Sequence, residues 1–262
     1  MAYPIQNIPF RKLLNTRDLG GLPVKGGGTI RPKTFLRAAS LYRLTPSDGR
    51  KLVEEYCVSF DIDLRIEKEL TRQPDTPLPG VKYLHFQLRE DVMENFDRRT
   101  GETIDKMVRR IPGMPQLYLN MVSKENSLEA LRGIFRVLFD EVTPGEKAAL
   151  FHCSEGKDRT GIVAALLEDL LGVPRDIIWD DYILSNKAFE KRNRRYYLGT
   201  RLIMRKATAD AFKDMYHANT DMLKNMFAYL DDTYGGTEGF FLETLGFRKS
   251  EIEAFRSKVI EQ

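Results

Sequence analysis

The stretch "FHCSEGKDRTGIVAALLEDLLG", residues 151–172, joins three kinds of local sequence. It starts within the apolar run "AALFHC" (148–153), passes through a polar loop, and ends in an apolar segment closed by Gly172 with Pro174 beyond it. This order indicates a buried strand, a loop and a helix. Within eight residues the loop holds a thiol, a glycine, a lysine, an aspartate, an arginine and a threonine. Such a loop is unsuited to a core and well suited to holding an oxyanion.

The spacing of Cys153 and Arg159, with five residues between them, has a chemical explanation. A loop of this length can turn its backbone N–H groups inward, and the following helix points its positive end at the same centre. Arg159 would bind two oxygens of a tetrahedral phosphate there. The same positive field would favour the thiolate of Cys153, which could attack phosphorus and form a cysteinyl-phosphate that water then hydrolyses.

Three neighbouring residues fit the same chemistry. Gly156 would let the backbone approach the anion without a side-chain clash. Thr160 could donate its hydroxyl to the sulfur and ease its departure from phosphorus. His152, directly before the thiol, is expected to hold the loop through hydrogen bonds rather than to move protons.

Other interpretations of the loop fit less well. A cysteine at a strand end is commonly an inert buried thiol, and we interpret Cys57 in that way. A Walker-type nucleotide loop would need an earlier glycine and a serine or threonine directly after Lys157, and neither is present. A sulfur-transfer loop also presents a thiol, but it does not obviously need Asp158 and Thr160 around the arginine.

Strand-like and helix-like patterns alternate along the rest of the chain. Strands are expected at 35–40, 57–65 and 81–88, and helices at 46–56 and 127–142. This alternation predicts an α/β fold whose sheet is substantially parallel.

Two charged segments, about 90–126 and 176–235, interrupt the alternation. We expect them to be helical elaborations, placed where lids and substrate walls tend to lie, on one domain that spans residues 1–262.

Composition narrows the class of protein. The formal net charge of +3 is too small to indicate nucleic-acid binding, but it suits an enzyme with anionic substrates. No apolar run approaches the roughly 18 residues that cross a bilayer. Two cysteines form no disulfide framework, and His85, His152 and His217 have no ligand spacing with them, so neither a metal nor a cofactor is expected. The opening residues lack the features of a signal peptide, which predicts a cytoplasmic protein or one exported without such a signal.

Several segments together resemble one family. "HCSEGKDRTG" (152–161) resembles the HCxxGKDRTG signature of the bacterial atypical tyrosine and dual-specificity phosphatases, which include phosphoinositide-active members. The other matching segments are "NTRDLGG" (15–21), "LRAASLYRLTP" (36–46), "DLRIEKE" (63–69), "DDYILSN" (180–186) and "YGGTEGFFLETLGF" (234–247). Ser154 and Glu155 depart from the small or apolar pair often seen in that family. Glu155 places a negative charge at the mouth of an anion site.

The resemblance implies a tyrosine-phosphatase-like central sheet flanked by helices, and a set of roles. Cys153 would be the nucleophile, Arg159 the phosphate clamp and Asp158 the general acid. Asp63 would hold Arg159 in place, and Lys157 would contact further phosphate or acidic groups of the substrate. The complete expected sets are Cys153, Asp158, Arg159, Thr160 and Asp63 for catalysis, and Ser154, Glu155, Gly156, Lys157 and Arg159 for substrate binding.

Three features outside the loop also carry an interpretation. Asp91, after the strand expected at 81–88, is a second candidate acid, or else Glu90 and Asp91 are solvated. "NTRDLGG" is most simply a structural turn in which Arg17 pairs with Asp18. The basic run 187–206 is either a solvated helix face or a surface that steers anionic substrates toward the loop.

The loop predicts hydrolysis of phosphomonoesters without a metal ion, and the resemblance implies that phosphotyrosine is the substrate. The resemblance extends the expected substrates to phosphoserine, phosphothreonine and phosphoinositides. The alternative is a non-catalytic module that keeps the loop only to recognise phosphate. Turnover of a generic aryl phosphate distinguishes the two.

Overall fold

The computed structural model describes residues 7–88, 113–203 and 217–262. Its centre is a five-stranded sheet in the order β1-β3-β6-β4-β5, in which all neighbours are parallel except the β1–β3 pair. The strands in that order are Arg17–Asp18, Phe35–Ala38, Ala148–His152, Val58–Asp63 and Lys82–His85. A separate antiparallel pair joins β2 (Thr29–Ile30) to β7 (Ile260–Glu261).

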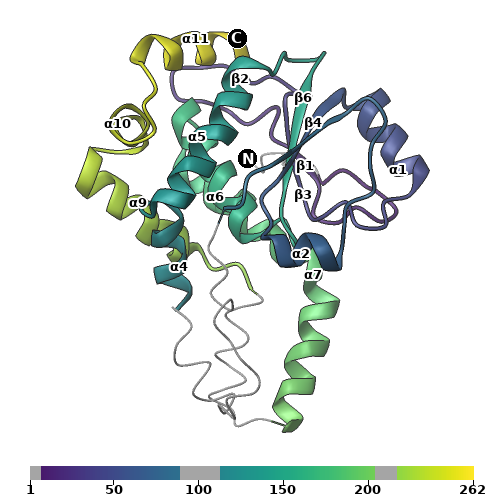
Figure 1. Ribbon diagram of the computed structural model, residues 1–262. Coiled ribbons are helices and arrows are strands. Elements are labelled where there is room, and N and C mark those ends of the chain that lie inside the picture. Colours follow the sequence, from purple (N-terminus) through teal and green to yellow (C-terminus); the bar gives the residue numbers. More distant parts are fainter. Residues whose placement is uncertain (1–6, 89–112, 204–216) are drawn as a thin grey trace.

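Helices cover both faces of the sheet (Figure 1). On one face lie α5 and α6, and on the other lies α1 with its π-helical continuation η1. The described helices are α1 (Pro46–Arg50), η1 (Lys51–Glu55), α2 (Glu67–Arg72), α4 (Met114–Met121), α5 (Glu125–Asp140), α6 (Asp158–Leu171), α7 (Arg175–Ile203), α9 (Thr220–Tyr234), α10 (Thr237–Glu243) and α11 (Lys249–Val259). In the described ranges no helix, the 29-residue α7 included, is long and apolar enough to cross a membrane.

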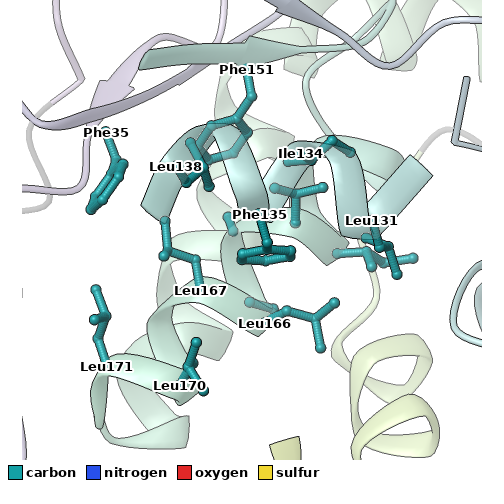
Figure 2. Packing of buried hydrophobic residues seen from close by; sticks show 14 of the residues in the cluster. Phe35, Leu131, Ile134, Phe135, Leu138, Phe151, Leu166, Leu167, Leu170 and Leu171 are labelled. Atoms are coloured by element: carbon teal, nitrogen blue, oxygen red, sulfur yellow. The ribbon is translucent and has the colours of Figure 1, made fainter. Parts of the chain in front are cut away.

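The two-residue period of the strands divides the core between these faces. Along β6, Ala149 and Phe151 pack on the α5–α6 side, whereas Ala148 and Leu150 pack on the α1 side. Figure 2 shows Phe151 pointing toward Leu138 of α5. Each large apolar side chain fully buried in this way contributes roughly 1.5–3 kcal/mol, so the central strand is held firmly from both sides.

The parallel pairing decides where the functional loop lies. Strands β3, β4 and β6 run in the same direction, so the residues that follow them meet at one edge of the sheet. That edge is where ligands bind in open α/β sheets. The loop after β6 leads directly into α6, which ends at Gly172 in the left-handed conformation (φ 90°).

The mixed α/β fold with a mostly parallel sheet confirms the expectation from the sequence, and the four expected strands and three expected helices are all present. Cys57 differs from its expected place in the core, because it is only partly buried and precedes β4 with φ 55°. The first expected elaboration contributes α4, and the second contributes α7 and α9. The rest of both, 89–112 and 204–216, lies outside the described residues.

Candidate active site

The loop between β6 and α6 wraps around the thiol of Cys153. Gly156 makes its tightest turn with φ 64°, a conformation that favours glycine. A Cβ atom at this position would come within 2.3 Å of the Ala38 carbonyl oxygen. The loop can therefore close against the end of β3 only because residue 156 has no side chain.

Cys153 is 3 % exposed, and its surroundings favour the thiolate. Burial raises the pKa of the thiol, but the positive charge of Arg159 and hydrogen bonds from Thr160 outweigh burial, so the pKa of Cys153 lies below its ordinary value. The Thr160 hydroxyl is buried and has no oxygen or nitrogen partner among the described residues, which leaves it available to the sulfur. The arginine and the threonine that follow in the same loop are thus the groups that favour the thiolate of Cys153.

Glu69 of α2 holds Arg159. The two terminal nitrogens of Arg159, Nη1 and Nη2, donate to Glu69 Oε2 and Oε1 at 2.5 and 2.8 Å. Nη1 also lies 3.4 Å from the Leu64 carbonyl oxygen. None of these contacts uses Nε, so Nε and the second hydrogen of Nη2 form an adjacent pair of donors for two phosphate oxygens.

The start of α2 fixes the Glu69 carboxylate. Its Oε2 accepts the Ile66 backbone N–H at 3.1 Å, as in a capping box, and Ser154 Oγ donates to its Oε1. Burial raises the pKa of Glu69, but the contacts with Arg159 outweigh burial and lower it to about 2. Glu69 is therefore a permanent anion that orients the arginine.

The expectation that Asp63 holds Arg159 is wrong. Asp63 accepts from Nε and Nη2 of Arg65, at 2.9 and 2.6 Å, and also from the Arg65 backbone N–H. These bonds engage both of its oxygens, and Tyr83 OH also donates to Oδ2 at 3.2 Å. The partner of Arg159 is instead Glu69, the last residue of the same "DLRIEKE" segment.

His152 lies in a buried group of charges behind the loop. Its Nε2 lies 3.1 Å from Asp61 Oδ1 and 3.3 Å from Asp75 Oδ2, and its Nδ1 lies 3.4 Å from the Cys153 carbonyl oxygen. Burial opposes the charged imidazolium, but Asp61 and the other carboxylates outweigh it and raise the pKa of His152 to about 9. At neutral pH the ring is a cation that fixes the backbone of the loop.

The donor atoms of Asp61, Asp75 and His152 lie within 4.8 Å of one another, close enough to surround a metal ion. Arg65 already contacts Asp75 at 2.5 Å, and His152 carries a proton between the carboxylates. A bound cation would have to displace both positive groups. The contacts are therefore those of an ion-pair network.

Replacing His152 with glutamine should reduce the free energy of unfolding near pH 6 by about 3–5 kcal/mol, because it leaves the buried carboxylates of Asp61 and Asp63 without their cation. Burial raises the pKa of Asp75 to about 7, so that group is mostly neutral at this pH. The pKa of about 9 in the folded state exceeds the ordinary 6.5. The stabilisation is therefore complete below pH 6.5 and is lost as the pH rises through about 9. Denaturant unfolding of wild type and variant should show a large difference at pH 6 and a much smaller one at pH 10. An equal difference at both values would contradict the charged state, and His217→Gln provides the control.

Three sequence motifs meet on the inner side of the loop. Asn15 Nδ2 donates to the carbonyl oxygens of Glu155 and Gly156 at 2.9 and 3.0 Å, and Arg37 Nη2 donates to the same Gly156 oxygen at 3.0 Å. Buried Asp181 of α7 forms ion pairs with both Arg37 and Arg17. The segments 15–21, 36–46 and 180–186 thus form one buried scaffold that holds the loop.

This scaffold corrects one expectation. Arg17 does not pair with Asp18, because its guanidinium turns inward to Asp181. Asp18 instead accepts the backbone N–H groups of Gly20 and Lys33, at 2.8 and 2.7 Å. The turn is structural as expected, but its arginine belongs to the support of the loop.

At the mouth of the loop, Glu155 has a cationic partner. Arg192 Nη2 contacts Glu155 Oε1 at 2.6 Å, and its guanidinium lies 4.1 Å from the centre of the Phe189 ring. The basic run 187–206 is therefore not only a solvated face, because one of its arginines reaches the loop. This contact also balances the negative charge that Glu155 places at the anion site.

The side chains of Lys157 and Asp158 lie side by side at the end of the loop. Lys157 is 1 % exposed, with Nζ 3.6 Å from Asp158 Oδ2 and 4.0 Å from Glu155 Oε2. Asp158 begins α6 and its side chain is 29 % exposed, so it can meet a ligand above the loop. Glu90 and Asp91 lie outside the described residues, and the choice between Asp91 and Asp158 as the acid stays a prediction.

Sequence reasoning missed Glu69, Asn15, Arg37 and Arg192 as contributors to this site. Each lies in a segment that the sequence singled out, but its partner is far away along the chain. For Glu69 a signal existed, since a carboxylate at the end of "DLRIEKE" lies on the first turn of a helix next to the loop.

The comparison with known families agrees with this geometry. A model described as the tyrosine phosphatase family matches residues 8–261. The chain belongs to the tyrosine phosphatase family. The match includes the loop, the scaffold beneath it and both elaborated segments.

Three relatives are between 26% and 29% identical to this chain. A tyrosine-protein phosphatase of Nostoc commune is 28% identical over 232 residues, which cover 86% of this chain and 74% of the relative. A putative tyrosine-protein phosphatase of Cupriavidus necator is 29% identical, covering 69% and 63%. The triple specificity protein phosphatase PtpB of Mycobacterium tuberculosis is 26% identical, covering 60% and 62%.

Proposed function

We propose that this protein is a cysteine-dependent tyrosine phosphatase that hydrolyses phosphomonoesters through a cysteinyl-phosphate. One observation carries the proposal above the others. The buried thiol of Cys153, whose pKa Arg159 lowers, opens the loop that leads from β6 into α6, and Glu69 accepts hydrogen bonds from both terminal nitrogens of Arg159. A thiolate and an oriented guanidinium at a helix N-terminus are what an attack on phosphate requires.

In the first step the Cys153 thiolate attacks phosphorus and the bond from phosphorus to the substrate oxygen breaks. Arg159 and the backbone N–H groups of residues 154–159 bind the phosphoryl oxygens, whose charge is spread over three atoms. Asp158 donates a proton to the departing oxygen.

In the second step water attacks phosphorus and gives a proton to Asp158. The bond between sulfur and phosphorus breaks, phosphate leaves and the thiolate is restored. Thr160, whose hydroxyl has no competing oxygen or nitrogen partner among the described residues, stabilises that thiolate.

Phosphotyrosine is the substrate that fits best. The nucleophile is almost fully buried, so a long, flat substrate side chain reaches it more readily than a short one. The name of the mycobacterial relative, a triple specificity protein phosphatase, supports extending the proposal to phosphoserine and phosphothreonine. We include phosphoinositides as a further class for the same loop. A role as a non-catalytic phosphate-recognition module is disfavoured by the lowered pKa of Cys153, because binding alone needs no thiolate.

The proposal predicts that the protein hydrolyses a simple aryl phosphate in the presence of excess chelator. Release of phosphate, measured with and without the chelator, checks this directly. A protein that binds phosphate without turning over the ester would support the recognition module instead. Parallel turnover of phosphotyrosine, phosphoserine and phosphothreonine peptides and of phosphoinositides then ranks the substrate classes.

A further inference from the structure

Two buried tyrosines outside the loop reach the carboxylate of Asp158. Tyr118 OH donates to Asp158 Oδ1 at 2.7 Å, and Tyr182 OH lies 2.6 Å from Tyr118 OH. The two residues are 0 % and 1 % exposed. Buried hydroxyl groups that hydrogen-bond in series are strongly oriented, since leaving one of them without a partner costs about 1–3 kcal/mol.

The direction of the hydrogen bonds follows from counting protons. Tyr118 has one hydroxyl hydrogen, and it is given to Asp158. Tyr182 must therefore donate to Tyr118, and the chain runs from Tyr182 through Tyr118 to the carboxylate. Burial and the nearby Asp158 hold the pKa of Tyr118 well above its ordinary value, so it stays a donor.

The backbone fixes both rings. Tyr118 belongs to α4 and Tyr182 to α7, the helices that the two elaborated segments contribute. The ring of Tyr182 packs against the first turn of α6, where a Cβ atom on Gly161 would come within 2.9 Å of it. The final glycine of "HCSEGKDRTG" thus makes room for the tyrosine that supports the acid.

We propose that Tyr118, supported by Tyr182, is a positioning residue for Asp158 in the phosphatase reaction. The inference rests on the proposed function and deepens it. Tyr118 holds Oδ1, which leaves Oδ2 as the oxygen that gives and takes the proton. A hydroxyl donor serves both steps, because Oδ1 accepts a hydrogen bond whether or not Oδ2 carries a proton.

The arrangement also favours Asp158 over Asp91 as the acid. A side chain that only neutralised charge at the loop would need no bond to one particular oxygen, and Lys157 already lies beside it. The orientation of one carboxylate oxygen matters for proton transfer, because the rate of that transfer falls steeply when donor and acceptor are misaligned.

The test is Tyr118→Phe, which removes one oxygen atom and keeps the ring. The measure is kcat/KM, because it reports the steps up to formation of the cysteinyl-phosphate. With phenyl phosphate, a poor leaving group, we expect a loss of about tenfold. With a dinitrophenyl phosphate, whose leaving group hardly needs a proton, we expect a loss below about twofold.

The same substitution in an Asp158→Asn background should add almost no further loss with phenyl phosphate. Two residues that act through one proton transfer are not additive in such a cycle. If Tyr118 had only a structural role, Tyr118→Phe would lower kcat/KM equally for both substrates, and the loss would remain in the Asp158→Asn background. That result would overturn the proposal.

Tyr182→Phe tests the outer member of the chain and should give a smaller loss with the same dependence on leaving group. Tyr229→Phe is the matched control, because it alters a partly buried tyrosine of α9 that packs against Tyr234. This variant should leave kcat/KM unchanged for both substrates. Thermal unfolding of each variant shows whether it is folded. If the wild type hydrolyses no aryl phosphate, the proposed function fails. If it does and Tyr118→Phe shows no selective loss, only the positioning role fails.

Discussion

Replacing Cys153 with serine is expected to reduce aryl phosphate turnover by at least about 10⁴-fold, the scale on which loss of a nucleophile acts. The reason is specific to this loop. Arg159 and Thr160 lower the pKa of the thiol, and the resulting thiolate attacks. A serine hydroxyl in the same position stays protonated and cannot replace it. Steady-state kinetics with a single aryl phosphate measures the loss.

The variant should still bind inorganic phosphate, because Arg159 and the backbone donors are unchanged. Calorimetric titration with phosphate checks that the loop is intact. Cys57→Ser is the matched control, since Cys57 is the other cysteine of the chain, is partly buried and precedes β4. Turnover retained by Cys153→Ser, or lost in the Cys57 variant, would contradict the proposed nucleophile.

Most of the fold could be predicted because it depends on local patterns. The run 148–153 is apolar throughout, as a strand buried on both faces must be, and β6 packs on two helical layers. Gly172 marked the end of α6 because a left-handed residue is needed there. Such features need no knowledge of distant partners.

The site was harder to predict where two carboxylates of one segment could each pair with the same arginine. "DLRIEKE" offers Asp63 and Glu69, and the sequence alone does not show which of them reaches Arg159. Arg65 decides the matter, because it folds back on Asp63 and occupies both oxygens.

The same difficulty applies to contacts that join distant segments. Arg17 lies next to Asp18 in the chain, yet it pairs with Asp181, which is 164 residues away. Tyr118 reaches Asp158 from a helix in a segment whose sequence shows only charge and helical character. Proximity along the chain favours a local ion pair. A buried guanidinium, however, must pair with a carboxylate that is buried next to it in the fold, wherever that residue lies in the sequence.

Replacing Arg159 with lysine should lower kcat/KM for an aryl phosphate by about 10²–10³-fold, the range found when an oriented donor to a transition state is removed. A lysine keeps the positive charge but has no fork, so it cannot hold Glu69 and two phosphoryl oxygens together. Because a cation would remain beside the sulfur, the thiolate should survive. The ultraviolet absorbance of the Cys153 thiolate, measured as a function of pH, distinguishes loss of the phosphate clamp at residue 159 from loss of the thiolate.

Glu69→Gln is the graded partner of that variant. Glutamine keeps the shape of the side chain but can accept from Arg159 through one oxygen only, so the guanidinium loses half of its support. We expect a loss of about tenfold, between the wild type and Arg159→Lys, with the thiolate retained because a negative charge near it has been removed. Asp63→Asn, which disturbs Arg65 and not Arg159, should have a smaller effect on kcat/KM than Glu69→Gln. The reverse order would restore Asp63 as the residue that positions the clamp and would show that the contact with Glu69 does not orient Arg159 during catalysis.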